Sequence, residues 1–254
     1  MLIKLFIIVI CLNISSLAQA QDIKLDADKR VEYHQKEQKL VAIGNATASK
    51  ENMSIKADTL IGYYSPTAKN KISRIEAIKS VTMTSDQTQA FGDSMIYDVS
   101  SDTATLKGKP AKIKTPDAQI TSDGDIVFYQ SEQKAIAKNN VKAIDQQGNL
   151  VNADEMIAYF KKDENNKLIL DYIDINDIIK IKTQDADITA KRGTYYANEG
   201  KIKLFEDVTI TQKGNILRGN MAETDLNTGI SKILSGKTNR VSGIFKETKK
   251  TKEK

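Results

Sequence analysis

The sequence is poor in the residues from which most catalytic and metal sites are built. Its 254 residues include one histidine, one cysteine and no tryptophan. His34 lies in a polar segment next to an expected turn, where a surface histidine is more common than a general base. One histidine and one cysteine exclude the usual metal-ligand sets and the Cys–His dyad. We therefore expect no catalytic residue, no metal site, no cofactor and no enzymatic activity.

Signatures of serine hydrolases, of nucleotide binding and of nucleic-acid binding are also lacking. No G-x-S-x-G, phosphate-binding loop or dinucleotide fingerprint occurs in the sequence. The formal net charge is +5, and much of it comes from residues 246–254, which hold five lysines and two glutamates. This lysine-rich segment is expected to be a disordered tail. Because the rest of the chain has no clustered basic stripe, a nucleic-acid partner is not expected.

The first twenty residues have the organisation of a secretory signal peptide. Lys4 forms a short positive region, and an apolar stretch from Leu5 to Leu12 follows it. The predicted cleavage-site residues are Ala18, Ala20 and Gln21. Cys11 lies inside the apolar stretch, so the mature chain would need no disulfide in an oxidising compartment. An uncleaved N-terminal anchor is the alternative.

A ten-residue segment, Ile55–Tyr64, recurs almost unchanged at Val151–Phe160. Ala, Asp, Ile and Tyr are identical in register, and most of the other positions exchange conservatively. Weaker copies share a small residue at the position of Ala57, every 29 to 37 residues. These anchor residues are Ala27, Ala57, Gly92, Ser122, Ala153, Ala190 and Gly219. A recurring period in this range predicts a repeat architecture.

Each repeat has the pattern of two antiparallel β-strands. Apolar residues alternate with polar ones, as at Leu25, Ala27, Val31 and Tyr33, and short turn signals follow every few residues. About 14–16 strands of typical length fit between the turns. One elongated all-β domain at residues 21–245, an antiparallel jelly roll or sandwich, is the favoured prediction, with a parallel β-solenoid as the alternative. The absence of tryptophan and of leucine-rich-repeat spacing removes the propeller and horseshoe classes.

The predicted inner face consists of Ile, Val, Leu, Ala and Met with some Tyr and Phe. Periodicity alone fits a closed, dry sandwich core, which is the commoner case. It also fits a pair of sheets that is left partly open and accepts hydrocarbon chains. Burial of each CH₂ group contributes about 0.8 kcal/mol, so a groove of this kind could bind an acyl chain without any catalytic residue.

The repeat unit, apolar-x-Ala-Asp-x-x-Ile-x-Tyr followed by a turn and another strand, resembles that of the LptA/OstA lipopolysaccharide-transport proteins. The segments Tyr97–Gly108 and Tyr129–Val141 carry the likeness most clearly, and it extends over about residues 22 to 235. The resemblance implies a twisted, slightly open β-jelly roll in the periplasm that shields the acyl chains of lipopolysaccharide. It also implies head-to-tail association and edge-strand contacts to LptC-like and LptD-like partners, in a bridge from the inner to the outer membrane.

Two sets of residues are predicted to carry these functions. The expected lipid-binding groove residues, taken from strict alternation around the anchors, are Val31, Tyr33, Ile55, Ala57, Ile61, Tyr63, Ile157 and Tyr159. The expected docking edges are the segments Ile23–Val31 and Leu217–Leu234. Two alternatives remain open: an LptC-like relative anchored by its N-terminal segment, and a β-solenoid surface or structural protein without a lipid groove.

Overall fold

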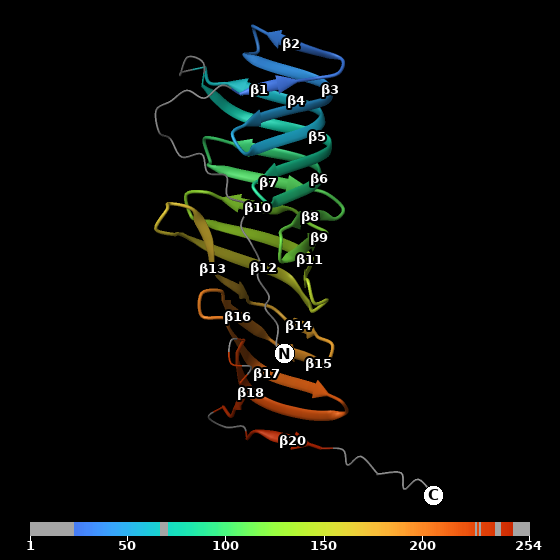
Figure 1. Ribbon diagram of the computed structural model, residues 1–254, viewed down its shortest axis with the longest axis vertical. Coiled ribbons are helices and arrows are strands. Elements are labelled where there is room, and N and C mark those ends of the chain that lie inside the picture. Colours follow the sequence, from blue (N-terminus) through green and yellow to red (C-terminus); the bar gives the residue numbers. More distant parts are fainter. Residues whose placement is uncertain (1–22, 67–70, 227, 229, 237–239, 246–254) are drawn as a thin grey trace, which may run out of the picture.

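The computed structural model is a column of twenty β-strands stacked along one long axis (Figure 1). The structure describes residues 23–66, 71–226, 228, 230–236 and 240–245. The strands are β1 (Lys24–Asp26), β2 (Arg30–His34), β3 (Lys39–Lys50), β4 (Met53–Tyr64), β5 (Ile72–Ser85), β6 (Thr88–Asp98), β7 (Thr103–Lys107), β8 (Ala111–Lys114), β9 (Ala118–Ser122), β10 (Ile126–Tyr129), β11 (Lys134–Asp145), β12 (Leu150–Lys162), β13 (Leu168–Ile175), β14 (Ile179–Lys182), β15 (Ala186–Ala190), β16 (Arg192–Tyr196), β17 (Lys201–Gln212), β18 (Asn215–Asp225), β19 (Ser231–Leu234) and β20 (Ser242–Ile244). Within these described ranges, no helix is long and apolar enough to cross a membrane.

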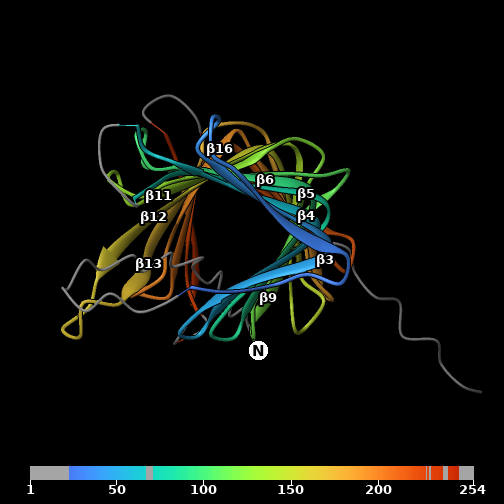
Figure 2. The same ribbon diagram turned by 90° about the horizontal axis from the view of Figure 1, so that it is seen from above.

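The strands form two half-sheets joined at a corner. One half-sheet follows the order β2-β3-β4-β5-β6-β7-β10-β11-β12-β13-β16-β17-β18-β19. The other follows β1-β3-β4-β5-β6-β8-β9-β11-β12-β14-β15-β17-β18-β20. Every pairing among the described strands is antiparallel, which confirms the predicted jelly roll and rules out the parallel β-solenoid. Viewed along the long axis, the two half-sheets surround one interior (Figure 2).

A β-bulge recurs where the long strands turn the corner. In β3, β5, β11 and β17, two residues with positive φ lie opposite a single residue of the next strand. The pairs are Gly44-Asn45, Lys79-Ser80, Asn139-Asn140 and Glu206-Asp207, and the single residues opposite are Asp58, Asp93, Asp154 and Asn220. A two-against-one bulge bends its strand and increases the local twist. We call a rung one long strand, or two consecutive short strands, that contributes to both half-sheets. The repeated bulge therefore explains why the rungs bend around the interior.

The anchor residues of the sequence repeat lie at this corner. Ala57 pairs with Ala46, directly next to the bulge, and Asp58 lies opposite the bulged pair of β3. The aspartates stabilise the corner: the Asp154 carboxylate accepts a hydrogen bond from the backbone N–H of Asn140 at 3.3 Å, and Asp58 forms a 3.0 Å ion pair with Lys79. The Ala-Asp motif thus has a structural role: it stabilises the corner.

The strand number exceeds the predicted 14–16 because several rungs are split into two short strands at the corner. The rung that holds the anchor Ser122 is divided between β9 and β10. Ser122 is fully buried, and its hydroxyl donates to the carbonyl of Lys138 in the neighbouring rung. A Cβ atom on Gly124 would lie 2.6 Å from that same carbonyl, so the chain passes too close to its neighbour for a regular ladder. The break falls at Asp123-Gly124-Asp125, between the two strands.

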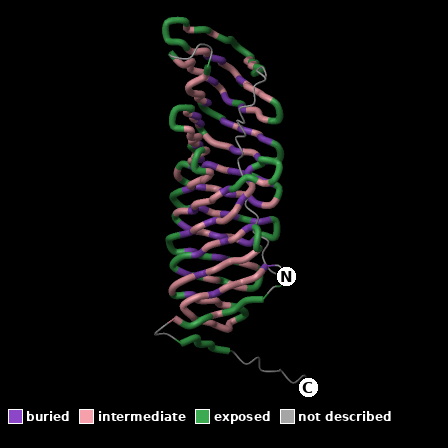
Figure 3. The backbone as a smooth tube through the Cα atoms, turned by 90° about the vertical axis from the view of Figure 1, so that its left-hand side faces the viewer, coloured by how far each residue is buried: buried purple, intermediate pink, exposed green. Residues whose placement is uncertain are grey.

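The core is one continuous apolar cluster that extends along the column from Ala42 to Leu226. Buried and partly exposed residues alternate along the rungs, while exposed residues collect at the turns and at the C-terminal end (Figure 3). Alternation of this kind gives every rung one face toward the interior and one toward solvent. The interior is therefore the only long apolar surface that the described strands enclose.

Candidate functional site

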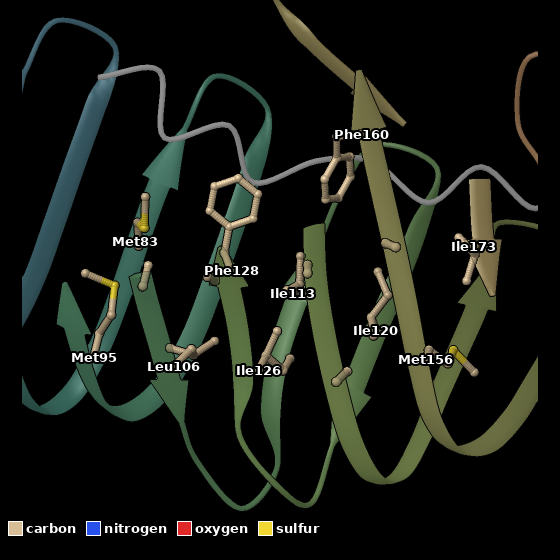
Figure 4. A pocket seen from close by; sticks show the side chains of 15 residues that line it. Met83, Met95, Leu106, Ile113, Ile120, Ile126, Phe128, Met156, Phe160 and Ile173 are labelled. Carbon is tan, nitrogen blue, oxygen red and sulfur yellow. The ribbon is translucent and has the colours of Figure 1, made fainter. Parts of the chain in front are cut away.

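An apolar cavity lies in the middle of the interior, between the two half-sheets (Figure 4). Its volume is about 80 Å³. The fifteen lining residues are all hydrophobic: Met83, Ala90, Met95, Ala104, Leu106, Ile113, Ile120, Ile126, Phe128, Ala135, Ala137, Met156, Ala158, Phe160 and Ile173. They come from β5 through β13, so both half-sheets contribute. A lining without charged or polar side chains suits hydrocarbon and offers nothing for acid–base chemistry.

Aromatic and methionine side chains shape this cavity. The rings of Phe128 and Phe160 are 6.0 Å apart at a 59° tilt, a geometry in which the edge of one ring can meet the face of the other. Met83, Met95 and Met156 line the cavity from three different strands, the first two on one side of it and Met156 on the other (Figure 4). Methionine is unbranched and adapts to irregular shapes. The cavity wall can therefore rearrange around a flexible chain more easily than a wall of branched residues.

A second cavity of about 30 Å³ continues the first toward the C-terminal end. Met156 and Ile173 line both cavities. The second cavity contains one buried phenol, that of Tyr195 in β16, whose side chain is 6 % exposed. Burial away from water raises the pKa of Tyr195 to about 12, because the charged phenolate would be poorly solvated there.

Two of the eight predicted groove residues belong to the buried core. Ile55 and Ala57 of β4 are both buried and pack in the apolar cluster. Neither lines the central cavity, which begins further along the column. Val31 and Tyr33 lie on the terminal strand β2 and are 49 % and 58 % exposed. Val31 pairs with the buried Ala42, so β2 extends the inner face at an end that no further described strand covers.

The other four predicted groove residues lie on the outer face, and their inward assignment was wrong. Ile61 and Tyr63 of β4 lie opposite Glu76 and Arg74, respectively, which form a salt bridge on the outer side. The residues that face inward at this place are Leu60 and Gly62 instead.

In the second copy of the repeat, Ile157 pairs with Asp174, and the ring of Tyr159 stacks on Tyr172 at 4.5 Å, outside the cavity. The inward positions here are Met156, Ala158 and Phe160. The bulge at the corner causes the error, because the strand leaves the corner with its two faces exchanged.

A signal for the missed residues is present in the sequence. In four repeats the third residue after the anchor is apolar and buried: Leu60, Met95, Met156 and Ala222 follow Ala57, Gly92, Ala153 and Gly219. An apolar residue at a spacing of three breaks the period of two. This spacing indicates a bulge, and it would have moved the predicted groove to the correct face.

The two ends of the column present strands with one unpaired edge. At the N-terminal end β1 and β2 each pair only with β3 among the described strands. At the other end β19 and β20 each pair only with β18. The predicted edge Leu217–Leu234 therefore needs a correction: β18 is paired on both sides, and the edges are β19 together with β20. Exposed apolar side chains occur at both ends.

No constellation typical of a catalytic centre is found among the described residues. They contain no group of three or more His, Cys, Asp or Glu side chains that could hold a metal ion. His34 contacts the Glu32 carboxylate at 2.8 Å in a partly exposed position at the end of β2. The predicted signal peptide, residues 1–20, and the lysine-rich tail, residues 246–254, lie outside the described residues.

Comparison with known proteins identifies a family for the sequence. The sequence matches the family model described as "LptA/(LptD N-terminal domain) LPS transport protein" twice, at residues 24–134 and 119–230. No curated protein gives a significant match. Among solved structures, the chain is similar to LptH from Pseudomonas aeruginosa, described as the LptA homologous periplasmic component of the lipopolysaccharide transport device. This similarity has 10 % identity and a TM-score of 0.22, covers 89 % of this chain and 96 % of LptH, and supports no detailed comparison. On the two family matches, which together extend from residue 24 to residue 230, the chain belongs to the LptA/(LptD N-terminal domain) family of LPS transport proteins.

Proposed function

We propose that this protein binds lipopolysaccharide in the periplasm, holds its acyl chains between the two half-sheets and passes it toward the outer membrane. The observation that carries the proposal is the continuous apolar interior with a wholly hydrophobic cavity at its centre. Transport of an amphipathic lipid through water needs such a shielded interior and no chemistry. Delivery to the periplasm rests on the predicted signal peptide at residues 1–20.

The energetics favour acyl chains as the cargo. A twelve-carbon chain gains roughly 9 kcal/mol on leaving water, at about 0.8 kcal/mol for each CH₂. The cavity of about 80 Å³ gives such a chain a place to start between the half-sheets. The flexible methionines of the lining let the wall adjust around the rest of the chain.

A photo-crosslinking experiment tests the location of the lipid. A photoreactive amino acid at Leu106, which lines the cavity, is expected to capture lipopolysaccharide. The same amino acid at Thr105, the next residue, is expected to capture little, because alternation turns that side chain to the outer face. The readout is a lipopolysaccharide-positive band after irradiation. Equal capture at both positions, or none at Leu106, would argue against a lipid site between the half-sheets.

The terminal strands suggest how the lipid is handed on. The edges of β1 and β2 could pair with the edges of β19 and β20 of a second copy, or with an LptC-like or LptD-like partner, by β-augmentation. Exposed apolar residues at both ends would be buried in such a contact: Val31, Tyr33, Ile230, Leu234 and Ile244. A contact between two different surfaces builds a filament rather than a closed dimer. In a filament the apolar interiors would join end to end.

Self-association is expected to depend on the exposed apolar residues of β2. The double substitution Val31→Lys and Tyr33→Lys places two charges on a surface that association would bury, so concentration-dependent association should be lost. Sedimentation velocity over a concentration series measures this. Ile178→Lys, at an equally exposed apolar position in the turn before β14, is the matched control and should associate normally. Unchanged association of the double variant would contradict the proposed docking end.

A further inference from the structure

The hydroxyl group of Tyr195 is a buried polar atom without a partner. Tyr195 points inward from β16, and its hydroxyl oxygen makes no hydrogen bond to any group of the described residues. A buried, unsatisfied hydroxyl is costly, so most buried polar side chains in native proteins have a partner. Because the phenol stays protonated up to a pH of about 12, it is a neutral hydrogen-bond donor under all physiological conditions.

The surroundings of Tyr195 do not favour a water molecule as this partner. The cavity of about 30 Å³ has room for a water, but a buried water needs two to four polar partners. Thr194 is the other hydroxyl in the lining, but it donates to the Asp174 carboxylate at 2.8 Å, on the face of β16 opposite to Tyr195. The remaining lining side chains are apolar. A ligand with a hydrocarbon body and one hydrogen-bond acceptor matches this environment better than water does.

A second inward tyrosine provides a comparison. Tyr97 of β6 is also buried, but its hydroxyl lies 3.5 Å from a carboxylate oxygen of Asp102. A tyrosine on the inner face of this fold can therefore reach a polar partner near the rim. Tyr195 has no such partner among the described residues, although its exposure is nearly the same.

We infer that Tyr195 is a specificity-determining donor that hydrogen-bonds an ester or amide carbonyl of an acylated lipid held between the half-sheets. The inference rests on the proposed lipid-binding function. Its geometric support is the continuity of the two cavities through Met156 and Ile173, which places the phenol along the path of a chain that occupies the central cavity. The hydrocarbon would contact the aliphatic lining, and the carbonyl would accept the phenol's hydrogen bond.

The test compares two probes of equal length. Methyl dodecanoate has an ester carbonyl, and tetradecane has the same number of chain atoms and no acceptor. Their affinities for the full mature chain are measured by displacement of a fluorescent apolar dye, with wild type, Tyr195→Phe and Tyr97→Phe. For each probe, the ratio of wild-type to variant affinity removes differences in solubility between the probes. Thermal unfolding of each ligand-free variant shows whether the fold is intact.

Tyr195→Phe is expected to weaken the affinity for methyl dodecanoate by about five-fold, because one neutral hydrogen bond is lost. The affinity for tetradecane should be unchanged. Its unfolding midpoint without ligand should equal or exceed that of wild type, because an unsatisfied hydroxyl has been removed. Tyr97→Phe should leave the affinity for both probes unchanged. An equal loss for both probes in Tyr195→Phe, or no loss for either, overturns the inference while lipid binding stands. If wild type binds neither probe, the proposed function fails as well.

Discussion

Replacement of Met156 by lysine is expected to abolish lipid binding and to lower the unfolding midpoint by roughly 10 °C, whereas lysine at the next residue, Ile157, should change neither. Met156 lines both cavities and is buried among apolar residues of both half-sheets. An ammonium group there has no counter-charge, and an uncompensated buried charge costs about 3–5 kcal/mol. The same charge would also lie in the space proposed for the acyl chain.

Ile157 provides the matched control on the same strand. Its cross-strand neighbour is Asp174 on the outer face. A lysine at this position would form a cross-strand pair of opposite charges with Asp174, and such a pair contributes only about 0.2–1 kcal/mol to stability. Thermal unfolding and lipopolysaccharide binding are measured for Met156→Lys and Ile157→Lys side by side. If both variants lose stability and binding equally, the face assignment of β12 after the corner is incorrect.

The second large effect is expected at the corner, where Gly92→Ala should destabilise the protein by about 1–3 kcal/mol. A Cβ atom on Gly92 would lie 2.4 Å from the carbonyl oxygen of Lys107 and 2.8 Å from a methyl group of Leu106. The first of these atoms belongs to the backbone of the next rung and cannot move without shifting that rung. Urea denaturation measures the loss, which should appear in the midpoint with an unchanged m-value.

Gly62→Ala is the control for this corner prediction. Gly62 lies in the same kind of strand, but a Cβ atom there has no other atom within 4 Å. Alanine should be neutral or should stabilise by about 0.4–1 kcal/mol, because it restricts the unfolded chain. Equal losses in both glycine variants would mean that general strand propensity, rather than close approach of the rungs, selects the small residue at the anchor.

The sequence was sufficient to predict the architecture, because three of its signals can be read along the chain without knowledge of the tertiary packing. Alternation along each strand requires only that one face is buried, and this predicts the all-β fold. The recurrence of Ala57 and its counterparts predicts stacked repeats, and the short turns predict antiparallel pairing. The structure confirms these features and explains the small anchor, since Ala57, Gly92 and Ser122 all lie where neighbouring rungs approach closely at the corner.

Strict alternation of apolar and polar residues was not sufficient to predict which residues line the groove. Val31, Ile55 and Ala57 keep the predicted face, whereas Ile61, Tyr63, Ile157 and Tyr159 lie on the opposite one. In both β4 and β12 the error begins at the corner, since one extra residue in the preceding strand, β3 or β11, shifts the pairing. The cavity around Phe128 and Phe160 was missed for a related reason: it forms between residues of different repeats, which no local pattern brings together.

By itself, then, the sequence determined the strand type, the repeat, the antiparallel stacking and the membership of a lipid-transport family. Only the tertiary structure decided which side chains face the interior, because a bulge changes the faces of a strand without leaving a clear mark on its composition. The pairing of Asn139-Asn140 with the single residue Asp154 is one such place. The structure alone also showed that Tyr195 is buried without a partner, because satisfaction of a hydroxyl depends on atoms from strands far apart in the chain.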